Sequence, residues 1–171
     1  MKIIVGITGA SGSIYAVSLL RRLLLRGGVE VLGVCSETGK AVLRAECGLG
    51  QEDFPFVNWS EPNNMFASIA SGSDCSDGMV IVPCSMNTLA CVANGISNNL
   101  LQRAAAVMLK ESRKLIVVPR ETPLNVIQLD AMLKLAKAGA TILPAAPGFY
   151  KQPQSIQDLI DFITERILAQ F

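Results

Sequence analysis

Short segments of glycine, proline and polar residues could bind or transfer a charged group. The first, Gly6–Ser13, places Gly9, Ala10 and Ser11 in a turn between an apolar run and an expected helix. Small residues let a ligand approach the backbone closely, and amides at a helix start attract an anion. The spacing is G-x-x-G-x-x-G, which weakens a dinucleotide-binding interpretation without excluding it, and tight turns need glycine in any case.

Two further segments set polar and charged side chains beside prolines. Pro83–Thr88 supplies hydroxyl and amide groups that could hold phosphate oxygens or the polar edge of a heterocyclic ring, although such groups also cap helices. Pro119–Leu124 holds Arg120 and Glu121 between two prolines, which fix the local backbone. An exposed ion pair would contribute little and would not need that rigid frame, so this segment favours a functional role.

A fourth segment, Pro144–Tyr150, is a stiff loop that ends in an aromatic ring with a hydroxyl. It could contact a substrate, or its ring could pack at a contact between subunits. Outside these segments, Lys110 and Arg166 have the spacing of ordinary solvated helix residues. Glu46 has the position of a polar residue near the end of a short helix, so spacing alone gives these three residues no role.

The residue types missing from the chain exclude several kinds of chemistry. None of the 171 residues is histidine, which removes histidine triads, histidine metal ligands and histidine acid–base catalysis. The five cysteines include no C-x-x-C pair and predict reduced thiols in the cytoplasm rather than a disulfide or metal framework. A net charge of +1 provides no field for nucleic acid, and no apolar run is long enough for a membrane span. The 50% apolar content also indicates surface that is buried against other subunits.

Strand-like and helix-like runs alternate along the chain and predict a single α/β domain over residues 1–171. The expected strands are Ile3–Ile7, Val29–Cys35, Met79–Val82, Leu115–Val118 and Thr141–Leu143. The expected helices are Ser13–Arg26, Thr38–Glu46, Asn87–Ala93, Leu100–Glu111, Val126–Ala138 and Ile156–Ala169, and Gly48–Asn64 is expected to be irregular. Strands this apolar predict a mostly parallel sheet with helices on both faces. Ligands bind at the carboxyl ends of such strands, which is where the segments described above lie.

Taken together, these segments resemble the flavin prenyltransferases, the UbiX/Pad family once called aromatic acid decarboxylases. The resemblance spans nearly the whole chain and includes Thr8–Gly12, Pro83–Thr88, Pro119–Leu124, Pro144–Tyr150 and the tail from Lys151 to Arg166. It implies a three-layer flavoprotein of Rossmann-like or flavodoxin-like fold. It also implies metal-independent transfer of a dimethylallyl group from dimethylallyl monophosphate to N5, then C6, of reduced FMN. Prenylated FMN would pass to UbiD-type decarboxylases, including those of ubiquinone synthesis, and the enzyme would be a dodecamer with sites at subunit junctions.

The same resemblance implies roles for residues at matching positions. FMN would be held by Gly9, Ala10, Ser11, Ser36, Ser85, Met86, Asn87, Thr88 and Arg120. The donor phosphate would be held by Lys110, Arg120, Glu121, Tyr150 and Arg166, where fixed cations stabilise the charge that builds on the leaving phosphate. Ser11 and Glu46 would manage the N5 proton, and Glu121 would assist proton transfer beside the phosphate, which makes these three the expected catalytic residues.

Two departures from the family pattern leave alternatives open. Asn87 stands where many members have lysine, and the chain stops at Phe171 where relatives often carry a longer tail. Flavin-dependent cysteine decarboxylases have asparagine at the position of Asn87, although they rely on a histidine that this chain lacks. The other alternative is a non-catalytic carrier of FMN or prenylated FMN, which would need neither Glu121 nor the phosphate-binding cations.

Overall fold

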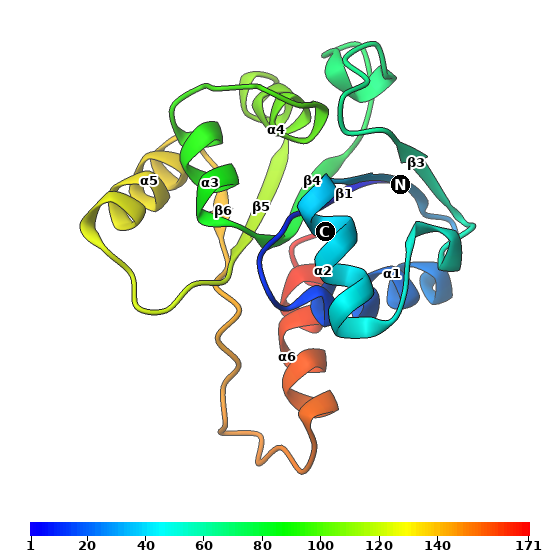
Figure 1. Ribbon diagram of the computed structural model, residues 1–171, viewed down its shortest axis with the longest axis vertical. Coiled ribbons are helices and arrows are strands. Elements are labelled where there is room, and N and C mark those ends of the chain that lie inside the picture. Colours follow the sequence, from blue (N-terminus) through cyan, green and yellow to red (C-terminus); the bar gives the residue numbers. More distant parts are fainter.

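The computed structural model describes residues 1–171 and contains one six-stranded parallel sheet (Figure 1). The strand order is β3-β2-β1-β4-β5-β6. The strands are β1 Lys2–Ile7, β2 Glu30–Cys35, β3 Val57–Ser60, β4 Gly78–Cys84, β5 Lys114–Pro119 and β6 Thr141–Ile142. Every residue of β4 is buried, as expected for a strand that is covered on both faces. The predicted flavodoxin-like α/β fold is therefore confirmed.

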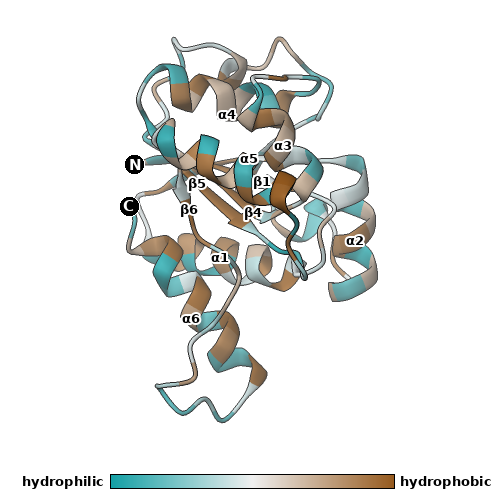
Figure 2. Ribbon diagram, turned by 90° about the vertical axis from the view of Figure 1, so that its left-hand side faces the viewer, coloured by the Kyte–Doolittle hydropathy of each residue, from teal (hydrophilic) through white to brown (hydrophobic).

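Six helices cover the two faces of the sheet. They are α1 Ser13–Arg26, α2 Glu37–Cys47, α3 Met86–Ala93, α4 Leu100–Lys110, α5 Val126–Lys137 and α6 Ile156–Leu168. One apolar core joins the sheet to α1, α2 and α6, and a second joins its other face to α3, α4 and α5. Figure 2 shows this arrangement, with hydrophobic strands between two helical layers. None of these helices has the length and apolar character needed to cross a membrane.

The prediction that Gly48–Asn64 is irregular was wrong in part. This stretch contains the edge strand β3 and a short 3-10 helix, Gln51–Asp53. Four residues are too few to show a clear alternating pattern, and prolines flank them in the sequence. β3 is fixed instead by tertiary contacts, because it pairs with β2 and its Trp59 ring packs against Gly33.

The chain between β6 and α6 leaves the sheet as an extended arm, residues 143–155, and α6 then runs back toward α1 (Figure 1). The base of the arm is tied to β5, because the Ala145 amide donates to the Pro119 carbonyl at 3.2 Å. Farther out, Phe149 and Tyr150 are 69% and 71% exposed. Val126 and Ile127 on α5 are 69% and 72% exposed. Large exposed apolar side chains on the arm and on α5 are candidates for surfaces that another chain covers.

Asp74 anchors the loop before β4 and provides a pH-dependent part of the stability. Its carboxylate accepts hydrogen bonds from Lys2 Nζ and the Ser76 amide, each at 2.9 Å, and from the Ser76 hydroxyl. Burial alone would raise the pKa of Asp74, but these hydrogen bonds outweigh it and lower the pKa to about 2. The folded pKa lies below the unfolded value of about 4, so this stabilisation is complete above pH 4 and is lost as the pH falls toward 2.

We expect Asp74→Asn to lower the free energy of unfolding by about 2 kcal/mol at pH 7, because the charge is lost and an amide nitrogen faces the Lys2 ammonium. Denaturant unfolding followed by circular dichroism at pH 7, 4 and 3 measures this difference, which should shrink below pH 4. Asp130→Asn is the control, because Asp130 is exposed and makes no hydrogen bond or ion pair. A difference that stays constant from pH 7 to pH 3 would contradict the prediction.

Candidate active site

A buried threonine joins two of the predicted segments at the carboxyl edge of the sheet. The Thr8 hydroxyl donates to the Pro83 carbonyl at 2.7 Å and accepts from the Ser85 amide at 2.8 Å. Thr8 is 1% exposed, so these two hydrogen bonds are shielded from water. Sequence reasoning gave Thr8 no role of its own, although a threonine that ends a buried strand directly before a glycine turn is a visible signal.

Arg120 joins the third segment to the first. Its backbone amide donates to the Cys84 carbonyl at 3.3 Å, and its Nε donates to the Ser11 carbonyl at 3.1 Å. Glu121, the next residue, is exposed, and its carboxylate accepts from the Thr122 amide at 3.0 Å. The loops after β1, β4 and β5 therefore form one continuous surface.

Glu46, near the end of α2, reaches the same surface. Its Oε2 accepts hydrogen bonds from the amides of Gly12 and Ser13, both at 2.9 Å, and its carboxylate lies near the Ser11 side chain. Partial burial acts to raise the pKa of Glu46, but the Ser11 side chain, the Gly12 and Ser13 amides and the charge of Arg120 outweigh it and lower the pKa. Glu46 is therefore ionised at neutral pH, which suits it to accept a proton through Ser11 rather than to donate one.

The starts of α2 and α3 offer amides to an anion, whereas the first amides of α1 are taken by Glu46. Ser36 caps α2, because its Oγ accepts from the Gly39 amide at 3.0 Å. Ser85 caps α3 by accepting from the Thr88 amide at 3.3 Å, so the simple capping interpretation holds for this residue. The first amides of a helix have no partner within it, which leaves those of Met86 and Asn87 facing outward with a partial positive charge.

The space beside these helix starts suits a flat polar ligand such as FMN. A Cβ on Gly9 would stand 2.7 Å from Thr38 Cβ, so only glycine lets the turn lie against α2. Ala10 is buried and Asn87 is exposed, and Ser36 and Ser85 directly follow β2 and β4 at the same edge of the sheet. Amides and hydroxyls of this kind match a phosphate and the carbonyl and imide groups of a flavin ring.

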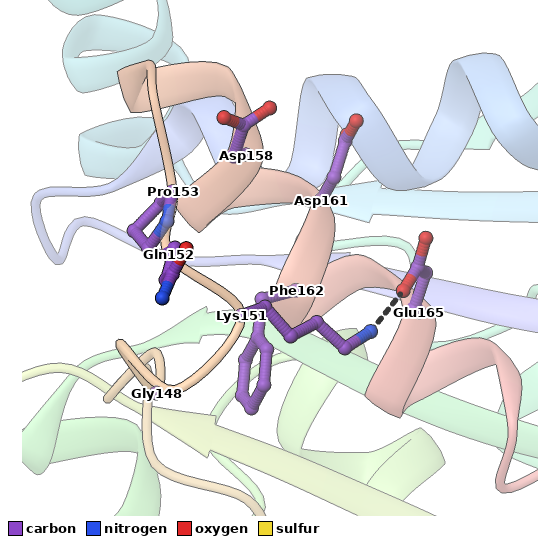
Figure 3. Close-up of a pocket in the computed structure, with 8 residues that line it drawn as sticks. All are labelled: Gly148, Lys151, Gln152, Pro153, Asp158, Asp161, Phe162 and Glu165. Carbon is purple, nitrogen blue, oxygen red and sulfur yellow. Dashed lines mark hydrogen bonds and ion pairs between the residues drawn. The ribbon is translucent and has the colours of Figure 1, made fainter.

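Tyr150 and Arg166, predicted phosphate ligands, lie together on a different part of the chain. The Tyr150 and Phe162 rings meet edge to face with centroids 5.8 Å apart, and the Arg166 guanidinium lies 5.7 Å from the Phe162 centroid. Beside them, the arm and α6 enclose a cavity of about 270 Å³ in which Lys151 pairs with Glu165 (Figure 3). Its other polar lining includes Asp158 and Asp161, so this cavity disfavours an anion, and none of the predicted site residues lines it.

Lys110 is separated from the other predicted site residues. It ends α4 beside the amino end of β5, where it pairs with Glu111, whereas Arg120 follows the carboxyl end of β5. Six residues of strand put these two edges about 17 Å apart, farther than a lysine side chain reaches. Lys110 therefore cannot contact Arg120 of its own chain.

Comparison with known proteins agrees with this architecture along the whole chain. The flavoprotein family matches residues 1–168. The flavin prenyltransferase LpdB of Lactiplantibacillus plantarum is 52% identical over 172 residues, which cover 99% of this chain and 92% of LpdB. The dodecameric FMN-dependent UbiX-like decarboxylase of Escherichia coli O157:H7 is 40% identical, with a TM-score of 0.97 over 100% of this chain and 94% of that one.

Two further solved structures differ in how similar they are to this chain. AnUbiX (PadA1), in complex with FMN and dimethylallyl pyrophosphate, is 40% identical with a TM-score of 0.94, over 98% of this chain and 90% of that one. The peptidyl-cysteine decarboxylase EpiD is 18% identical with a TM-score of 0.64, over 98% of each chain, and shares the fold alone. This chain belongs to the flavoprotein family and, within it, to the flavin prenyltransferases.

Proposed function

We propose that this flavin prenyltransferase joins the dimethylallyl group of dimethylallyl monophosphate to N5 and C6 of reduced FMN and releases phosphate. The observation that carries the proposal is the group of Ser11, Glu46 and Arg120 at the carboxyl edge of the sheet. Arg120 Nε donates to the Ser11 carbonyl, and Glu46 accepts from the two amides that follow Ser11. In this group Glu46 would be the proton acceptor and Arg120 the cation that binds phosphate, beside the loops proposed to hold FMN. The related AnUbiX complex, which contains FMN and dimethylallyl pyrophosphate, supports FMN and a phosphorylated dimethylallyl donor as the two substrates.

Ser11 and Glu46 would remove the proton that N5 of the reduced flavin must lose when a carbon bonds there. The Ser11 hydroxyl would accept that proton while passing its own to Glu46. The lowered pKa of Glu46 keeps it ionised, and hence ready to accept, at neutral pH. The flavin supplies the nucleophile and needs no metal, and the amides and hydroxyls at the starts of α2 and α3 would hold it through its phosphate and polar edge.

The phosphate of the donor would be held by Arg120 and by cations that reach the site from other copies of the chain. Charge builds on the leaving phosphate as the allyl group departs, and fixed cations stabilise it before the reaction begins. Tyr150 and Arg166 lie on the exposed arm and α6, and Lys110 lies at the opposite edge of the sheet. We therefore propose an oligomer, a dodecamer like the related E. coli protein, in which neighbouring chains complete each site.

The product would be used outside this chain. We propose that prenylated FMN passes to a UbiD-type decarboxylase and that the reaction takes place in the cytoplasm. The five cysteines are all free thiols, which supports a reducing compartment.

Anaerobic incubation with reduced FMN and dimethylallyl monophosphate, followed by mass spectrometry of the extracted flavin, tests the proposal. A flavin heavier by one five-carbon unit is expected. Repeating the incubation with dimethylallyl diphosphate identifies the preferred donor. Bound but unmodified FMN with both donors would contradict the proposed transfer and favour the carrier.

We expect Glu121→Gln to slow prenylation about tenfold while the affinity for FMN stays unchanged. This is a small effect for an acid–base residue, because the released phosphate can take over part of the proton transfer. Glu61→Gln is a matched control, since Glu61 is also exposed but pairs with Lys40 on α2. Equal prenylation rates in Glu121→Gln and the wild type would refute a catalytic role for Glu121.

A further inference from the structure

The Arg120 side chain has a hydrogen bond at Nε, while the two terminal nitrogens of its guanidinium group are free. Its Nε is held by the Ser11 carbonyl at 3.1 Å, while its two Nη atoms have no hydrogen-bond or ion-pair partner within the chain. A free fork on a fixed stem can make two parallel hydrogen bonds to a phosphate. One hydrogen bond at Nε does not by itself fix the methylene groups of the side chain, since arginine has several rotatable bonds and loses rotamer entropy when it is immobilised.

The ring of Tyr15, in the first turn of α1, and the Arg120 stem both lie close to Gly12. A Cβ on Gly12 would stand 3.2 Å from Tyr15 Cδ2, 3.3 Å from Tyr15 Cε2 and 3.9 Å from Arg120 Cγ. The ring and the arginine stem thus both lie within 4 Å of the position that a Gly12 Cβ would occupy. Gly12 also has a φ of 107°, which disfavours any other residue, so the turn is built to let the ring come this close.

The position of the Tyr15 ring is itself fixed. The Tyr15 amide donates to the Gly12 carbonyl at 3.0 Å, and the half-buried ring packs against the core cluster of α1, α2 and α6. The Tyr15 hydroxyl makes no hydrogen bond in the structure, and partial burial raises its pKa, so it stays protonated at neutral pH. The feature that touches the surroundings of Arg120 is therefore the ring and not the hydroxyl.

We infer that Tyr15 is a positioning residue: its ring forms the wall that holds the Arg120 stem, so that the free guanidinium fork meets the phosphate of a bound substrate. The inference rests on the proposed function, in which Arg120 binds the donor phosphate, and the family resemblance implies that Arg120 contacts FMN as well. It adds a residue outside the predicted site whose effect is exerted only through Arg120.

A double-mutant cycle tests this inference with Tyr15→Leu, Tyr15→Phe and Arg120→Met. We expect Tyr15→Leu to raise the KM for dimethylallyl monophosphate about tenfold with a smaller change in kcat, because a mobile arginine binds phosphate less well. Tyr15→Phe keeps the ring and should remain within about twofold of wild type. In the Arg120→Met background, Tyr15→Leu should have no further effect on KM, because the residue that it positions is gone.

Melting temperatures and FMN affinity, measured by fluorescence quenching, separate the possible outcomes. Additive effects of Tyr15→Leu and Arg120→Met on KM would overturn the inference, as would failure of Tyr15→Phe to preserve the wild-type KM. If the wild type shows no prenylation, the proposed function fails. The FMN affinities of the wild type, the single variants and the double variant then test the inference. Non-additive losses of FMN affinity would still support the positioning role, and additive losses would refute it.

Discussion

Replacing Glu46 with glutamine should slow flavin prenylation by about 10²- to 10⁴-fold, the range expected when a proton acceptor is removed from a positioned pair. Glutamine keeps an oxygen that can accept from the Gly12 and Ser13 amides, which Glu46 now bonds at 2.9 Å. It then turns its NH₂ group toward Ser11 and cannot take the Ser11 proton. The start of α1 should therefore stay capped while the proton path is lost.

Single-turnover rates with pre-bound reduced FMN give the measurement, with FMN affinity and melting temperature as checks on structure. Glu52→Gln is the matched control, because Glu52 is an exposed carboxylate that pairs with Arg44 away from Ser11. The lowered pKa of Glu46 keeps it ionised throughout the neutral range, so the wild-type rate should not fall through loss of this group until the pH is clearly acidic. A Glu46→Gln variant with the wild-type rate would exclude Glu46 as the proton acceptor.

The sequence was most informative where local patterns and fold rules coincide. Apolar strands such as β1 and β4 alternate with amphipathic helices, and parallel strands must place their carboxyl ends along one edge. The turn around Gly9 and the Arg120 segment could therefore be expected at that edge before any coordinates were known. Arg120 and Ser11 are 109 positions apart, yet topology alone brings them to within hydrogen-bonding distance.

What could not be predicted depends on side-chain reach and on tertiary contacts. The hydrogen bonds of Glu46 to the α1 amides depend on how α2 packs beside α1, which no local spacing records. Tyr15 looked like an ordinary helix residue, because its contact with Gly12 exists only in the folded turn. The edge strand β3 was missed for the same reason, since it is stabilised by pairing with β2 rather than by its own short pattern.

The fold of a single chain does not bring Lys110 to the other predicted site residues. Family resemblance implies a place for it near the donor phosphate, but its own chain holds it at the amino edge of the sheet, about 17 Å from the Arg120 edge. Both statements hold together only if Lys110 serves the site of another copy. In a closed oligomer with head-to-tail contacts, the amino edge of one chain can face the carboxyl edge of the next.

Mixing two inactive variants should therefore restore activity. Lys110→Met and Ser11→Ala should each slow prenylation about a hundredfold, through loss of phosphate stabilisation and of the proton path. In hybrids co-expressed with two tags and purified through both, about a quarter of sites would combine native Ser11 from one chain with native Lys110 from another. If Lys110 acted within its own chain, no site in the hybrid would hold both native residues and activity would stay at the level of the single variants.

Lys114→Met, which removes a neighbouring exposed cation on the same edge, should be active by itself and so separates a specific role of Lys110 from a general effect of charge. If Lys110→Met alone kept the wild-type activity, Lys110 would have no role in the site.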